Sequence, residues 1–158
     1  VISSSLLEGF GYIFIDANNW KKPLVARDLS TLEGIKDIFS LLSSFFYKTV
    51  SVILDDAEKL QLKNSYQKGL EIYSKILDKN LIKSVLNEIF KIIDADTTDF
   101  SYLSAQMQYN HIKKTEENSD YKNRLAEVNK KLLESINTLL TNFRADSSSD
   151  EIIKNYFS

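Results

Sequence analysis

The sequence predicts an all-α fold, a single-domain bundle of five to six helices. From residue 30 onward, apolar residues recur at steps of three and four, which is the spacing of one helix face, rather than alternating as they do along a strand. The chain has 158 residues, 43% of them hydrophobic and 27% charged, as expected of one globular domain. Only 4 glycines and 1 proline interrupt the pattern. We therefore expect one helical domain over residues 1–158.

Residues 1–29 are expected to form an irregular segment or a short helix, followed by a loop. The run Ser5-Leu-Leu-Glu8 has the form of a capping box and favours a helix over about residues 6–17. The glycines at positions 9 and 11 oppose this helix, each by about 1 kcal/mol relative to alanine. Residues 12–15 also fit a short buried strand that ends at Asp16. Pro23 then indicates a loop.

Residues 30–144 are expected to form the helical core. A second capping box, Ser30-Thr-Leu-Glu33, precedes the most apolar stretch of the chain. The β-branched run at residues 49–53 favours a strand locally, but no breaker separates it from the helical pattern, so we extend this helix to about Leu54. Further helices are expected at about residues 55–77, 80–93, 99–114 and 121–144, with a short terminal helix at residues 150–157.

The helix starts are predicted from polar residues at the ends of the apolar patterns. Asp55, Asp56 and Glu58 suit the positive end of a helix dipole. Asn80 is expected to cap the following helix. The interior of the bundle is then closed by contacts between helices alone, without strand edges at which aspartates could gather around a metal ion.

The charge balance and the residue types exclude several classes of function. With 20 basic and 22 acidic side chains the net charge is −2, so we expect no nucleic-acid partner. The absence of cysteine excludes thiol nucleophiles and Cys-ligated zinc. The single histidine, His111, is expected to be exposed or partly packed. We therefore expect no catalytic, cofactor-binding or metal-binding residues, and a protein that is not an enzyme.

Two acidic clusters are interpreted as structural. Asp94, Asp96 and Asp99 lack the glycine and the twelfth-position glutamate of a calcium loop, so a solvated turn is expected there. The residues around Asp55 are expected to mark a helix start.

A magnesium-dependent nuclease is kept as the second alternative function. Residues 12–19 and 51–56 both fit a hydrophobic strand that ends in aspartate, and in this they resemble nucleases of the PIN and NYN type. The resemblance implies Asp16 with Asp55 or Asp56 as metal ligands, and Asn19 as a substrate contact. The hundred or so following residues show no third or fourth strand, although a parallel sheet needs alternating strands and helices.

Aromatic residues outside the predicted helix faces are the candidates for partner binding. Trp20 in the predicted loop either closes the end of the bundle or anchors a partner. Tyr102, Tyr109 and Tyr156 are candidates of the same kind. No spacing code identifies the ligand or the binding face, and the oligomeric state stays open.

The helices are rich in Lys, Asn, Ser and Ile, the chain has no cysteine, and it opens at Val1 rather than Met. In these features it resembles the helical outer-surface lipoproteins of Borrelia spirochaetes. The resemblance implies a non-enzymatic surface antigen, held on the bacterial outer membrane by an N-terminal lipid anchor outside the sequence. It also implies partners among host or vector proteins. The first alternative is an intracellular helical adaptor or regulatory module in the cytoplasm.

Overall fold

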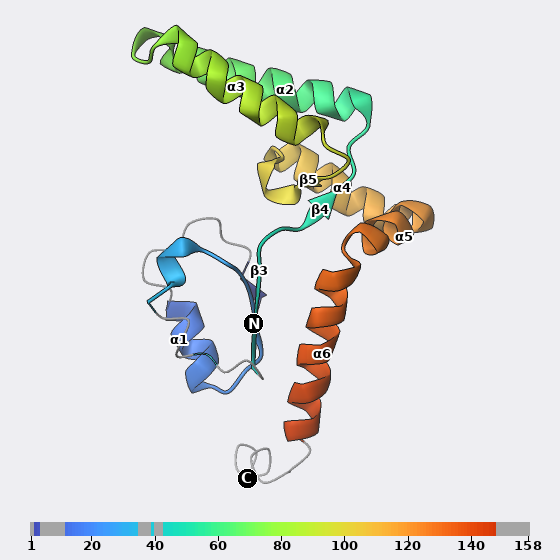
Figure 1. The fold of residues 1–158 in the computed structure, drawn as a ribbon. Helices are drawn as coiled ribbons and strands as arrows, with labels where there is room; N and C mark the ends of the chain where they lie inside the picture. The colour runs from blue at the N-terminus through green and yellow to red at the C-terminus, as the bar shows by residue number, and fades with distance from the viewer. Residues whose placement is uncertain (1, 4–11, 35–38, 40–42, 148–158) are drawn as a thin grey trace. The chain divides into compact units, whose positions relative to one another are not determined.

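The computed structural model describes residues 2–3, 12–34, 39 and 43–147. The chain divides into two compact units. Unit 1 comprises residues 1–49 and 130–158, and unit 2 comprises residues 50–129. Helices predominate in both (Figure 1), so the prediction of a mainly helical protein is confirmed.

Unit 1 is built on a three-stranded parallel sheet. Strands β1 (Ile2–Ser3), β2 (Leu24–Arg27) and β3 (Ser44–Tyr47) lie in the order β1-β2-β3. In the register, Val25 lies opposite both Ile2 and Phe45. Helix α1 (Tyr12–Asn19) connects β1 to β2, as a parallel pair requires a crossover rather than a hairpin.

The core of unit 1 forms where α1 packs against the sheet. Phe14 and Ala17 of α1 are buried together with two residues of β2, Leu24 and Ala26. These two residues lie two positions apart and therefore on one face of the sheet. Leu32, from the 3-10 helix η1 (Ser30–Leu32), completes this cluster. Helix α6 (Lys130–Ser147) contacts β3, and Figure 1 shows it on the side of the strand away from α1.

Unit 2 is a helical assembly around one short antiparallel ladder. Strand β4 (Ser51–Val52) pairs with β5 (Thr98–Asp99). Between them, α2 and α3 form a helical hairpin, and after them α4 and α5 are joined by a sharp turn (Figure 1). The bounds are α2 Asp56–Glu71, η3 Ile72–Lys75, α3 Lys79–Asp94, η4 Phe100–Tyr102, α4 Ala105–Glu117 and α5 Ser119–Val128.

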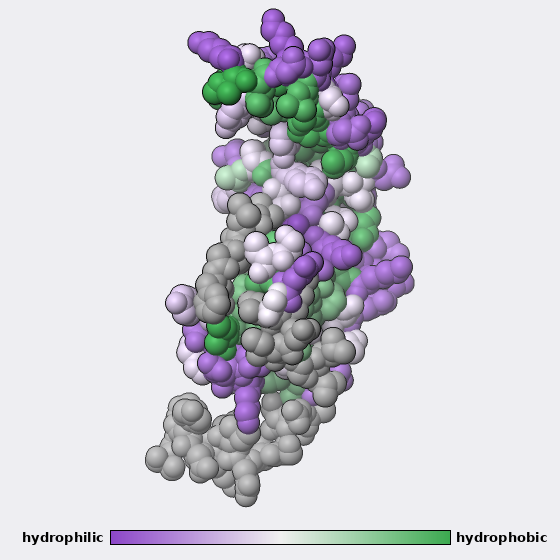
Figure 2. All heavy atoms as spheres, turned by 60° about the vertical axis from the view of Figure 1, so that its left-hand side comes forward, coloured by the Kyte–Doolittle hydropathy of each residue, from purple (hydrophilic) through white to green (hydrophobic). Residues whose placement is uncertain are grey.

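The core of unit 2 joins the ladder to three of its helices. It consists of the buried apolar residues Val52, Leu54, Leu62, Ile93, Leu103 and Met107. Apolar side chains are also exposed at the η3 end of the α2–α3 hairpin, where Figure 2 shows hydrophobic atoms on the surface. Within the described residues, no helix has both the length and the hydropathy needed to cross a membrane.

Local capping explains where the helices of unit 2 begin. Asp55 accepts a hydrogen bond from the Glu58 backbone N–H, and the Glu58 carboxylate accepts one from the Asp55 N–H, each at 2.9 Å. This capping box confirms the helix start predicted at residues 55–58. The predicted cap at Asn80 is wrong, because Asp78 accepts the hydrogen bonds from the N–H groups of residues 80 and 81.

The prediction of an all-α interior closed by helix contacts alone is wrong, because both units contain a sheet. The helix predicted from Ser30 to Leu54 is the main error. Ser30–Leu32 forms a single 3-10 turn, and β3 and β4 occupy the later part of the predicted range. The aromatic and β-branched residues of this segment favour strand, and pairing with β2 and β5 satisfies their backbone groups.

Other element boundaries also differ from the prediction. Residues 12–15 are helical in α1 rather than a strand, and the predicted loop contains β2. The helix predicted at 99–114 begins at Ala105, after β5 and η4. The long helix predicted at 121–144 is two helices separated at Asn129. The terminal helix predicted at 150–157 lies outside the described residues.

Candidate functional site

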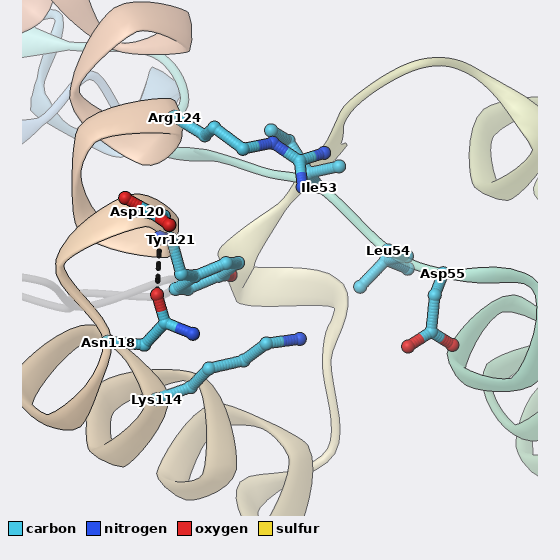
Figure 3. A pocket seen from close by; sticks show the side chains of 8 residues that line it. All are labelled: Ile53, Leu54, Asp55, Lys114, Asn118, Asp120, Tyr121 and Arg124. Atoms are coloured by element: carbon cyan, nitrogen blue, oxygen red, sulfur yellow. Dashed lines mark hydrogen bonds between the residues drawn. The ribbon is translucent and has the colours of Figure 1, made fainter.

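A pocket in unit 2 lies between the β4–α2 connection and the turn from α4 to α5 (Figure 3). Its volume is about 220 Å³. Acidic, basic and apolar side chains all line it, so the pocket can contact both the charged and the apolar parts of a ligand. The lining residues are Ile53, Leu54, Asp55, Lys114, Asn118, Asp120, Tyr121 and Arg124.

The α4–α5 turn brings one wall of the pocket together. The Asn118 N–H donates to the Lys114 carbonyl at 3.0 Å and ends α4. The Asn118 side-chain oxygen accepts from the Tyr121 N–H at 2.9 Å and caps α5 (Figure 3). One asparagine thus terminates one helix and starts the next, which places Lys114 and Tyr121 on the same wall.

Behind this wall, Tyr121 is held by the buried His111. The Tyr121 hydroxyl lies 2.5 Å from His111 Nδ1, and the histidine side chain is only 3% exposed. His111 Nε2 makes no hydrogen bond with the described residues and lies 3.5 Å from Glu58 Oε1. The prediction of an exposed or partly packed histidine is therefore wrong.

The protonation states in this group follow from burial. Burial lowers the pKa of His111, although the Glu58 carboxylate acts in the opposite direction. The imidazole is therefore neutral at pH 7. Burial also raises the pKa of Tyr121, so its hydroxyl keeps its proton and shares one hydrogen bond with Nδ1. On the other side of the ring, Nε2 faces the Glu58 carboxylate at 3.5 Å.

Two cationic side chains lie beside Tyr121. Lys114 Nζ is 4.7 Å from the centroid of the Tyr121 ring, a cation–π distance, and 3.9 Å from Glu58 Oε1. Arg124 is exposed, and Figure 3 shows its side chain extending toward Ile53. It makes no ion pair or hydrogen bond with the residues that the structure describes. The pocket thus carries one cation on α4 and one on α5.

A second candidate region lies at the β1–α1–β2 crossover of unit 1. In open parallel sheets, ligands bind at the carboxyl ends of the strands. A helix that follows such a strand presents free N–H groups and the positive end of its dipole to phosphate groups. The chain order β1, α1, β2 follows this general pattern, and residues 4–11, between β1 and α1, lie outside the described residues.

The metal site implied by the nuclease alternative is wrong, because its residues do not lie at the ends of neighbouring strands. Asp16 lies within α1 rather than at the end of a strand, and Asn19 is the last residue of that helix. Asp55 and Asp56 belong to unit 2 and begin α2, where Asp55 serves as a helix cap. Over the part of the chain that the structure describes, no group of three or more histidine, aspartate and glutamate side chains is arranged to hold a metal ion.

The residues predicted to bind a partner are distributed over both units. Trp20 is 65% exposed, Tyr109 61% and Tyr102 45%. The Tyr102 carbonyl also accepts a hydrogen bond from the Tyr66 hydroxyl at 3.0 Å. Tyr156 lies outside the described residues. Their role in binding stays a prediction.

Sequence reasoning missed the pocket because its residues come from three separate segments. His111 and Tyr121 are ten positions apart, which is no regular helix spacing, and the α4–α5 turn alone brings them together. The available signal was the break in periodicity before Asn118, a residue that favours helix caps.

The comparisons with known proteins give one informative match. No family model and no solved structure matches the chain. Over 145 residues the chain is 30% identical to a protein of Petrotoga mobilis named mannosylglucosyl-3-phosphoglycerate synthase. The alignment covers 91% of this chain, and the chain spans only 27% of the length of that relative.

This match corrects the predicted function. A synthase is an enzyme, whereas the sequence was interpreted as a non-enzymatic, lipid-anchored surface antigen that binds host or vector proteins. The composition of Lys, Asn, Ser and Ile that supported that interpretation is not specific to one class of proteins, and an alignment over most of the chain outweighs it.

Proposed function

We propose that this chain is part of a glycosyltransferase that attaches a sugar to a phosphorylated hydroxy acid of the phosphoglycerate type. The observation that carries this proposal is the 30% identity over 145 residues to mannosylglucosyl-3-phosphoglycerate synthase. Because 145 of 158 residues are aligned, the match includes most of unit 1 and most of unit 2. The proposal therefore concerns both units and not one common motif.

The architecture of unit 1 supports a role in holding an activated sugar. Sugar donors commonly carry their sugar on a phosphate or diphosphate, which leaves as an anion. A parallel strand, a glycine-containing connection and a helix N-terminus form a frequent phosphate site in α/β folds. Unit 1 has the order of elements found in such sites, a parallel strand β1 followed by helix α1 and strand β2.

Such a site contributes to transfer through electrostatics and positioning. As the acceptor hydroxyl attacks the sugar, negative charge develops on the departing phosphate. In a site of this kind the N–H groups at the start of the helix favour that charge, because they are held in place before the reaction begins. Holding donor and acceptor together also removes much of the entropic cost of their encounter.

A direct transfer assay tests the proposal. The protein is incubated with a panel of nucleoside-diphosphate hexoses and with 3-phosphoglycerate or glucosyl-3-phosphoglycerate, and products are identified by mass spectrometry. We expect an acceptor that has gained one hexose. The Petrotoga relative, assayed in parallel, shows that the substrates are competent.

Donor binding provides a second readout, because the chain spans only part of its relative. We expect ligand-observed NMR to show binding of at least one sugar donor. If the relative is active but this protein shows no sugar transfer and no donor binding, the proposal is contradicted.

A further inference from the structure

We propose that the unit 2 pocket binds the phosphorylated hydroxy-acid end of the acceptor, a small anion carrying a carboxylate, a phosphate and hydroxyl groups. The inference rests on the proposed function, because the class of acceptor comes from the product named for the relative. The location of the site comes from the pocket itself.

The two cations of the pocket are suited to two separate anionic groups. Lys114 comes from α4 and Arg124 from α5, and Figure 3 shows their side chains on different sides of Tyr121. A guanidinium forms paired hydrogen bonds with a carboxylate or phosphate, and an ammonium acts as a point charge on a phosphate. Arg124 is uncommitted among the described residues, and Lys114 Nζ is 3.9 Å from Glu58, beyond hydrogen-bond length.

The two acidic residues of the pocket lining each lie at the N-terminus of a helix. Asp55 already accepts the Glu58 N–H, and its charge lies at the positive end of the α2 dipole. Asp120 lies in the first turn of α5, where the helix dipole has the same effect. Their oxygens are acceptors for hydroxyl groups, so the pocket favours a hydroxylated acid over a simple inorganic anion.

The size of the pocket limits the ligand. Its 220 Å³ is below the roughly 300 Å³ at which pockets for drug-sized ligands begin. A three-carbon acid phosphate is of a suitable size, and a whole nucleotide sugar is too large. Ile53 and Leu54 supply an apolar part of the lining against which a short carbon chain can pack.

The part of the wall formed by Tyr121 and Lys114 is held by contacts within the protein before any ligand binds. The hydrogen bond to His111 fixes the Tyr121 hydroxyl, and Asn118 fixes the Tyr121 backbone. Lys114 lies over the ring of this tyrosine. A wall of this kind loses little conformational entropy on binding, which favours affinity for a small ligand.

Calorimetric titration with 3-phosphoglycerate tests the inference. We expect wild-type protein to bind it, and Lys114→Gln and Arg124→Gln each to weaken binding roughly tenfold or more, because each removes a charge-assisted hydrogen bond. Lys113→Gln and Lys122→Gln are matched controls on the same two helices and outside the pocket lining; they should change the dissociation constant by less than about twofold. Thermal unfolding of each variant establishes that the fold is unchanged.

The ligand series separates this inference from the proposed function. Uncharged glycerol should not bind, and inorganic phosphate should bind more weakly than 3-phosphoglycerate. No binding of 3-phosphoglycerate, or equal binding by the pocket and control variants, overturns the inference, even if the protein transfers sugar to another acceptor. Binding that depends on Lys114 and Arg124 supports it, even where no sugar transfer is detected and the proposed function fails.

Discussion

His111 links the pocket wall to the stability of unit 2. Its ring contacts the Tyr121 hydroxyl on one side and faces Glu58 on the other, and burial lowers its pKa. In the unfolded chain the imidazole has its ordinary pKa of about 6.5. Acid therefore protonates the unfolded state more readily than the folded state, and this residue destabilises the folded protein as the pH falls below about 6.5.

The first prediction concerns this pH dependence. We expect the free energy of unfolding in urea to fall between pH 7.5 and about pH 5.5, and His111→Gln to reduce that fall, because glutamine keeps a polar side chain but does not titrate in this range. The measurement is a pair of urea titrations at the two pH values for each protein. An equal change in both proteins would show that other groups cause the pH dependence.

Of two local features of unit 2, the start of α2 was predicted from the sequence and the contact between His111 and Tyr121 was not. The helix start at residues 55–58 was predicted because acidic side chains favour the positive end of a helix dipole, a feature of neighbours within one turn. The pairing of His111 with Tyr121 was not, because it requires the reversal of the chain at Asn118.

Among the secondary-structure elements, the end of α5 is hydrogen-bonded to strand β4 through the side chain of Asn129. Its side-chain oxygen accepts from the Ser51 N–H at 2.8 Å, and its amide group donates to the Ser51 carbonyl at 2.7 Å. The side chain thus pairs with both backbone groups of Ser51, as a neighbouring strand would. This contact between residues 78 positions apart keeps the backbone of a two-residue strand satisfied.

The second prediction follows from this pairing. Asn129→Ala should lower the free energy of unfolding by about 1–3 kcal/mol, because it leaves the half-buried N–H and carbonyl groups of Ser51 without these partners. Asn123→Ala, at an exposed position of α5, should change it by about 0.5 kcal/mol or less. Chemical denaturation of the two variants and the wild type gives the comparison, and equal effects of the two substitutions would contradict the role of Asn129.

The strands were the elements that the sequence analysis assigned wrongly. The segment at residues 44–54 has the residue types of strands, but it follows a helical pattern without a breaker, and no local feature decided between the two. Pairing with β2 and β5 decided it, because a strand's hydrogen bonds go to other segments while a helix satisfies its own.

Among the described residues of the molecule as a whole, each unit has a buried cluster of its own. Val52, Leu62 and Ile93 belong to the core of unit 2, and Phe14 and Leu24 belong to that of unit 1. Neither buried cluster includes a residue of the other. Loss of packing in one unit should therefore leave the interior of the other unit intact.

The third prediction tests this separation. Leu62→Ala should cost about 2–5 kcal/mol in unit 2, because Leu62 is only 1% exposed, whereas Leu60→Ala on the same helix, at a site that is 60% exposed, should cost much less. Hydrogen exchange of backbone amides should then speed up in α2 and α3 of the Leu62 variant but not in β2. Equal acceleration in both units would show that they unfold together.

The mainly helical character of the protein and the start of α2 could be predicted from the sequence, because a helix face and acidic residues at a helix start are patterns among near neighbours. It also excluded thiol chemistry through the absence of cysteine. Only the tertiary structure decided that residues 24–27 and 44–47 form a parallel sheet, and that Lys114, Tyr121 and Arg124 meet around one pocket. Both depend on contacts between segments that are distant in the chain, and such contacts leave no periodic pattern in the sequence.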